Sequence, residues 1–167
     1  MEEYSQKLDE AQNFADIFEM VKDLVMQKIG NVRGGLNLGL MELGNSREGW
    51  LGGFYPTGSN IIVMNKTPLR RLAETKPSLV KPYVFMVLLH EYLHSLGYLD
   101  EKICRGISYK ICREVFGEKH DATEMAYDIS SFMKYITYPE GFPQLDKDID
   151  SIQVIENIDK ESDFYFG

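Results

Sequence analysis

The amino-acid sequence predicts an α+β fold, in which one helix precedes a small sheet and further helices follow it. Apolar residues recur every three or four positions over residues 9–28, as on one face of an amphipathic helix. Residues 36–43 instead alternate between the two faces of a strand. The segment 84–89 is apolar at every position, which indicates a central buried helix.

The strands are expected early in the chain, after the first helix. Gly30 is placed to end that helix in the left-handed conformation. After the strand at 36–43, residues 50–55 and 61–64 have the aromatic and β-branched character of two more short strands. Residues 152–155 are a candidate fourth strand, so we expect a sheet of three to four strands.

Helices dominate the chain after the third strand. A short helix opens near residue 67, and the buried helix begins near Pro82 and ends near residue 96. Asp100 is placed to cap the helix that follows. Asp121 with Glu124 forms a capping box, which predicts a last helix over 122–135.

The length of 167 residues suits one domain, so residues 1–167 are expected to fold together. The expected core covers residues 9–136, and an acidic tail covers residues 144–167. The formal net charge of −8 makes nucleic acid an unlikely partner, because phosphate binding needs clustered Lys and Arg. The composition does not indicate an oligomeric state.

The sequence also predicts a cytoplasmic protein with no membrane partner. Its start lacks the basic and apolar regions of a signal peptide. The longest apolar run, 83–89, is far shorter than the roughly 20 residues of a membrane helix. Cys104 and Cys112 are eight positions apart in a helical pattern, about 12 Å, so both are expected to be reduced thiols.

The segment His90-Glu91-Tyr92-Leu93-His94 carries the clearest chemical signal. Residues four apart share one face of a helix, so His90 and His94 can direct two imidazole nitrogens at one ion. Zn²⁺ accepts such nitrogens at about 2.0–2.1 Å. Glu91 can then act as general base on a water whose pKa zinc lowers to about 7. We therefore predict a Zn²⁺ cofactor held by His90 and His94, with Glu91 as the catalytic residue.

Zinc requires a further protein ligand, and the sequence leaves three candidates open. Asp100 follows His94 with Gly97 between them, and a glycine can turn the chain back toward the metal. His120 lies in a turn before a helix, where a loop ligand can stand. Glu124 lies on the last predicted helix and can supply a carboxylate.

The pattern from 52 to 105 resembles the small zincin-like, metzincin-like metallopeptidase family whose signature is H-E-x-x-H-x-x-G-x-x-D. The matching segments are Gly53-Phe54-Tyr55, Ile61-Ile62-Val63, Pro68-Leu69-Arg70-Arg71 and His90 through Asp100. The resemblance covers roughly residues 14–105, and its last twenty or so residues are the specific part.

This resemblance implies a minimal zincin-like fold and a zinc metallopeptidase that hydrolyses peptides or proteins. It implies His90, His94 and Asp100 as the zinc ligands and Glu91 as the base. The chain departs from the family by continuing far beyond the motif, through His120, so the third ligand stays open.

A second resemblance is to the bacterial rRNA-maturation endoribonucleases, which carry H-x-x-x-H-x-x-x-x-x-H, often with L-G-Y inside it. Leu96-Gly97-Tyr98 matches that element. These enzymes lack a glutamate after the first histidine and have a third histidine where this chain has Asp100. The alternatives to a peptidase are therefore an endoribonuclease-like hydrolase and a metal-binding module without turnover.

Two further expectations concern access to the site. A peptide substrate is expected to add to a sheet edge by main-chain hydrogen bonds, and residues 61–65 are the candidate strand. The acidic tail is a candidate to fold over the cleft and restrain access.

Overall fold

The computed structural model describes residues 2–46, 49–139 and 153–155, and it confirms the α+β class. Two helices come first, α1 (Glu2–Glu10) and α2 (Phe14–Ile29). Three strands follow, β1 (Asn37–Met41), β2 (Gly53–Phe54) and β3 (Ile61–Asn65). The remaining elements are α3 (Lys66–Thr75), η1 (Pro77–Leu79), α4 (Val80–Ser95), α5 (Glu101–Phe116), α6 (Asp121–Tyr127), η2 (Ile129–Phe132), α7 (Met133–Ile136) and β4 (Gln153–Ile155).

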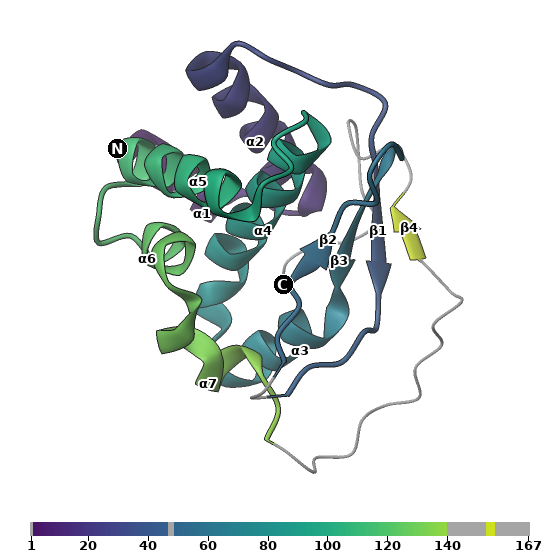
Figure 1. Ribbon diagram of the computed structural model, residues 1–167. Helices are drawn as coiled ribbons and strands as arrows, with labels where there is room; N and C mark the ends of the chain where they lie inside the picture. Colours follow the sequence, from purple (N-terminus) through teal and green to yellow (C-terminus); the bar gives the residue numbers. More distant parts are fainter. Residues whose placement is uncertain (1, 47–48, 140–152, 156–167) are drawn as a thin grey trace.

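The sheet is mixed and has the strand order β2-β3-β1-β4. Strand β3 pairs in parallel with β1 and antiparallel with β2, while β4 pairs antiparallel with β1. Strand β3 therefore has a partner on each side, so the expectation that residues 61–65 offer a free edge to a peptide is wrong. The edge strand nearest the helices is β2 (Figure 1).

The N-terminal helical segment differs from its prediction because of a cap. The Asn13 side chain accepts a hydrogen bond from the Asp16 amide, so α2 begins at Phe14 rather than near residue 9. The residues before it form the separate helix α1. Gly30 ends α2 in the left-handed conformation with φ 80°, as expected.

The last predicted helix, 122–135, is interrupted in the structure. Asp128 has an extended backbone with φ −155°, and its side chain accepts a hydrogen bond from the Ser130 amide. This cap starts a new short helix, so α6 ends at Tyr127. The N-cap of α6 is His120 rather than Asp121, which occupies the first helical position.

Helix α4 is the centre of the molecule and is buried around nearly its whole circumference. Helix α2 packs on it through an edge-to-face contact of Phe18 with Tyr92, whose ring centroids are 5.6 Å apart. Helix α5 packs on it through Phe85 and Phe116, at 4.9 Å. The sheet lies on the side of α4 away from α5 and α6 (Figure 1). The motif in the second half of α4 is thus held from several directions.

Cys104 and Cys112 are free and buried, which confirms the expected pair of thiols. Across residues 2–46, 49–139 and 153–155, no helix combines the length and apolar character that crossing a bilayer requires. The proposed role of the acidic tail falls almost entirely outside the described residues.

Strand β2 fits tightly between β3 and α4 at Gly53. A Cβ atom there would lie 2.6 Å from the Val63 carbonyl oxygen and 3.2 Å from a methyl group of Val87. Val87 precedes His90 by one helical turn. The glycine therefore sets the separation between the edge strand and the motif-bearing helix.

Gly53→Ala should lower the free energy of unfolding by about 2 kcal/mol, because backbone and packed side chains must shift to admit the methyl group. Urea unfolding followed by circular dichroism measures this. Gly106→Ala is the matched control, since a Cβ at this exposed position in α5 meets nothing within 4 Å. The control should gain about 0.5–1 kcal/mol from helix propensity. Equal stability of both variants would contradict the close approach at Gly53.

Candidate metal centre

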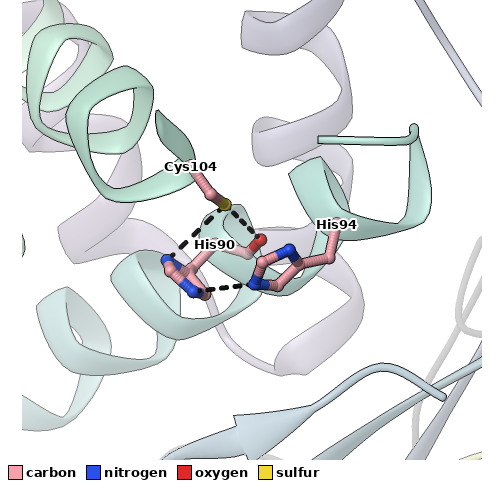
Figure 2. Close-up of side chains that lie close together, drawn as sticks. All are labelled: His90, His94 and Cys104. Carbon is pink, nitrogen blue, oxygen red and sulfur yellow. Dashed lines mark hydrogen bonds between the residues drawn. The ribbon is translucent and has the colours of Figure 1, made fainter. Parts of the chain in front are cut away.

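Helix α4 brings His90 and His94 together on one face, and their Nε2 atoms lie 3.0 Å apart (Figure 2). The two rings meet edge to face, with centroids 4.6 Å apart. His94 Nδ1 lies 2.7 Å from the Tyr98 carbonyl oxygen. Because a carbonyl only accepts hydrogen bonds, Nδ1 carries the proton and donates. The Nε2 atom of a neutral His94 is then the nitrogen that offers its lone pair.

The turn between α4 and α5 depends on Gly97, whose φ of 107° is in a region that other residues rarely adopt. The Gly97 amide donates to the His94 carbonyl, and the Tyr98 amide donates to the Leu93 carbonyl. These bonds end α4 and aim the Tyr98 carbonyl at His94. Asp100 then caps α5 by accepting a hydrogen bond from the Ile103 amide at 2.9 Å.

Glu101, the first residue of α5, reaches both histidines. Its Oε1 lies 2.8 Å from His94 Nε2, and its Oε2 lies 3.1 Å from His90 Nε2. In a tetrahedral site with bonds of about 2.0–2.1 Å, ligand atoms lie roughly 3.3 Å from one another. The three contacts at 2.8, 3.0 and 3.1 Å, two of which end on different oxygens of Glu101, are close to that spacing. The arrangement therefore suits a single divalent ion.

The contact of Glu101 with both histidines is not predicted from the sequence. Its neighbour Asp100 fitted the signature spacing, and an acidic residue in the first turn of a helix is ordinarily explained by the helix dipole. The available signal was its position seven residues after His94, just past a glycine turn. Which of two adjacent carboxylates faces the histidines depends on how α5 lies against α4, which the sequence does not give.

Cys104, one turn further along α5, lies close to the two histidines (Figure 2). Its Sγ is 3.7 Å from His90 Nδ1, and its S–H donates to the His90 carbonyl oxygen at 3.2 Å. Ligand atoms of His90, His94 and Cys104 all lie within 4.8 Å of one another, so these three residues can hold a metal ion.

The three ligand candidates from the sequence lie elsewhere. Asp100 uses its carboxylate as the cap of α5. His120 Nδ1 accepts a hydrogen bond from the Ala122 amide, and its ring stacks on Phe116 at 4.3 Å. Glu124 is exposed on α6. Within the described ranges, none of them belongs to the metal-binding group of His90, His94 and Cys104.

Burial and neighbouring charges perturb the groups at the site. Burial lowers the pKa of His90, although the Glu101 carboxylate opposes this. Burial raises the pKa of Glu91 to about 7, and the charge of Glu101 adds to the effect. Partial burial would raise the pKa of Glu101, but the two histidines lower it overall. Burial raises the pKa of the Cys104 thiol to about 12, so without an ion it is a neutral thiol.

A cavity of about 520 Å³ opens beside these residues. His90 and Glu91 line it from α4, and Glu101 lines it from α5. Residues 50–53 bound it at the edge strand, and residues 125–129 bound it at the end of α6. Glu91 is only 6% exposed, yet it is among the lining residues. The predicted base therefore reaches the same space as His90.

Comparison of the chain with protein-family models, curated proteins and solved structures finds no match. The chemistry of the site is therefore inferred from its own geometry.

Arg33 fixes the C-terminal end of α4. Its guanidinium donates to the Ser95 carbonyl at 2.9 Å, to the Ser59 carbonyl at 2.7 Å and to the Tyr55 hydroxyl at 2.7 Å. Its backbone amide donates to the Tyr92 hydroxyl at 2.8 Å. Arg33 thus links the loop before β3 to the last turn of α4, which contains His94.

Arg33→Met should lower the free energy of unfolding by about 1–3 kcal/mol, because the Ser59 and Ser95 carbonyls lose a charged donor. It should also weaken zinc binding, since the turn that carries His94 loses a fixed contact. Urea unfolding and chelator competition measure the two effects. Arg33→Lys keeps the charge but not the forked donors, so it should fall between wild type and Arg33→Met. Wild-type values for Arg33→Met would show that Arg33 does not hold this end of α4.

Proposed function

We propose that this chain is a zinc-dependent hydrolase of the peptidase type, in which His90, His94 and Glu101 hold the metal and Glu91 is the general base. The observation that carries the proposal is the convergence of two imidazole Nε2 atoms and one carboxylate within 3.1 Å of each other. The His94 lone pair and the Glu101 carboxylate are both acceptors 2.8 Å apart, so a proton or a metal cation must lie between them. A divalent metal ion satisfies these two groups and the His90 nitrogen at once.

Glu101 is a better third ligand than Cys104. Glu101 faces the Nε2 atoms of both histidines, whereas Cys104 is next to the opposite nitrogen of His90. A His90 ring that directs Nε2 at the ion keeps Nδ1–H for an outer acceptor, and the Cys104 sulfur is in place for that contact. Cys104 is thus assigned to orienting His90, and Glu101 to closing the ligand set.

A bound zinc ion supplies a Lewis acid that polarises a carbonyl and makes a water molecule more acidic. Glu91 lies next to His90 in the sequence, lines the same cavity and is not needed as a ligand. Its carboxylate takes one proton as the water oxygen adds to the scissile carbonyl carbon. It then gives that proton to the departing amine nitrogen as the C–N bond breaks.

The surroundings favour a peptide over RNA. Arg105 is the single Lys or Arg among the described residues that line the cavity, while Glu91, Glu101 and Asp128 are acidic. A phosphate backbone needs several cations, so an endoribonuclease is disfavoured. The cavity instead borders the edge strand β2, where an extended peptide can add main-chain hydrogen bonds.

The third ligand is tested by zinc affinity in four variants, measured by chelator competition. Glu101→Gln should lose at least about 100-fold, which exceeds the 10–100-fold typical of an outer partner. Cys104→Ser should lose about tenfold or less. Asp100→Asn and His120→Asn retain a capping side chain, so both should bind zinc like wild type. A loss larger for Cys104→Ser or Asp100→Asn than for Glu101→Gln would overturn the assignment.

Catalysis is tested by Glu91→Gln, which replaces the base by an amide of nearly the same shape. The variant should keep one zinc per chain and lose about 10²–10⁴-fold in peptide hydrolysis, because it cannot accept the proton. Metal analysis and a panel of internally quenched peptides provide the readouts. If zinc-loaded wild type cleaves no peptide in the panel, the peptidase proposal fails and a metal-binding module remains.

A further inference from the structure

One face of α5 lines the cavity beyond the proposed metal ligand. Glu101, Arg105 and Ser108 all line it, and their spacing of four and three residues places them along a single stripe of the helix. The stripe that presents a carboxylate to the histidines therefore also presents a guanidinium and a hydroxyl, one and two turns further on.

Arg105 is an exposed cation at the cavity. It forms no ion pair with any residue in the described ranges, although Glu101 lies one helical turn before it. Glu101 is instead engaged by His90 and His94. A guanidinium presents a rigid fork of donors that matches a carboxylate in two parallel hydrogen bonds. The other charged side chains that line the cavity are acidic, so Arg105 is placed to bind an anionic group of the ligand.

Ser108 provides a second, independent observation at the same place. It is 2% exposed, and its Oγ lies beside the Cys104 thiol, a weak hydrogen-bond partner, and has no nitrogen or oxygen partner among the described residues. A buried hydroxyl left unpaired costs about 1–3 kcal/mol, which an oxygen atom of a ligand can relieve. Ser108 also lines the cavity, so its hydroxyl lies just beneath the surface of the space that Arg105 borders.

We propose that Arg105 and Ser108 form a carboxylate-binding subsite beside the metal centre, and that it takes the free C-terminal carboxylate of a peptide. The inference rests on the proposed function and specifies its substrate class. The volume of about 520 Å³ is that of a small-ligand pocket. Residues 125–129 add a further boundary to those of the edge strand and the two helices, which suits the end of a peptide better than a continuing chain.

Binding is measured with the fluorescence of Trp50, the single tryptophan of the chain, which lines the cavity and donates to the Tyr83 hydroxyl. The protein is the zinc-loaded Glu91→Gln variant, so that hydrolysis does not interfere. The probes are N-acetyl-alanyl-phenylalanine and its C-terminal amide. The acid should bind at least about tenfold more tightly than the amide, as expected for hydrogen bonds to a charged group.

Arg105→Met in the same background should abolish the preference for the acid, and Arg105→Lys should keep part of it. Lys110→Met is the control, because it removes an exposed cation of α5 that does not line the cavity. Equal binding of acid and amide, or an unchanged preference in Arg105→Met, would overturn the proposal. Loss of zinc from Arg105→Met would also overturn it, because Arg105 would then support the metal ligands.

Two more measurements are needed. One distinguishes a chain-end carboxylate from a side-chain carboxylate, and the other distinguishes the subsite from the proposed peptidase. An amidated peptide ending in aspartate that binds as tightly as the free acid would overturn the assignment to a chain end. Preference for the acid without hydrolysis by the wild-type protein would support the subsite and sink the proposed peptidase. Hydrolysis of amidated and free peptides at equal rates, with no binding preference, would support the proposed peptidase and contradict the subsite.

Discussion

The candidate site depends on holding three groups, two imidazole Nε2 atoms and one carboxylate, about 3 Å apart at the end of a helix that is otherwise buried. Two of these groups belong to α4, where a spacing of four residues fixes their separation. The third comes from α5, whose position is set by the turn at Gly97 and by the contact of Phe85 with Phe116. The apolar packing around α4 thus fixes the positions of the polar groups at its end.

Several contacts around α4 hold the groups of the candidate site in position. Arg33 holds the turn, Gly53 allows the edge strand to approach, and the Tyr98 carbonyl orients His94. None of these groups belongs to the proposed ligand set or is the proposed base. Their common effect is to hold both imidazoles in fixed orientations, with His90 and Glu91 lining the cavity. A metal site requires such fixed orientations because distorted ligand geometry weakens binding.

The local parts of this arrangement could be predicted from the sequence. The apolar run of α4, the shared face of His90 and His94 and the stop at Gly97 all depend on neighbours within a few residues. The break in α6 was missed because Asp128 ends the helix through its backbone and cap, without the glycine or proline that ordinarily marks such a point. The contact of Glu101 with the histidines could not be predicted for a different reason. It depends on the packing of two helices, whereas local spacing favours Asp100, whose side chain caps α5.

Helix α5 carries groups for two purposes on one rigid stripe. Glu101 contacts the histidines, while Arg105 and Ser108 line the same cavity further along the helix. A metal ion held by Glu101 would therefore bind on the same helix face as the two groups proposed to bind an anion. If such an ion changes the affinity for the anionic ligand, the ligand changes the affinity for the ion by the same free energy. The turn at Gly97, which joins α4 to α5, therefore positions the groups of both sites.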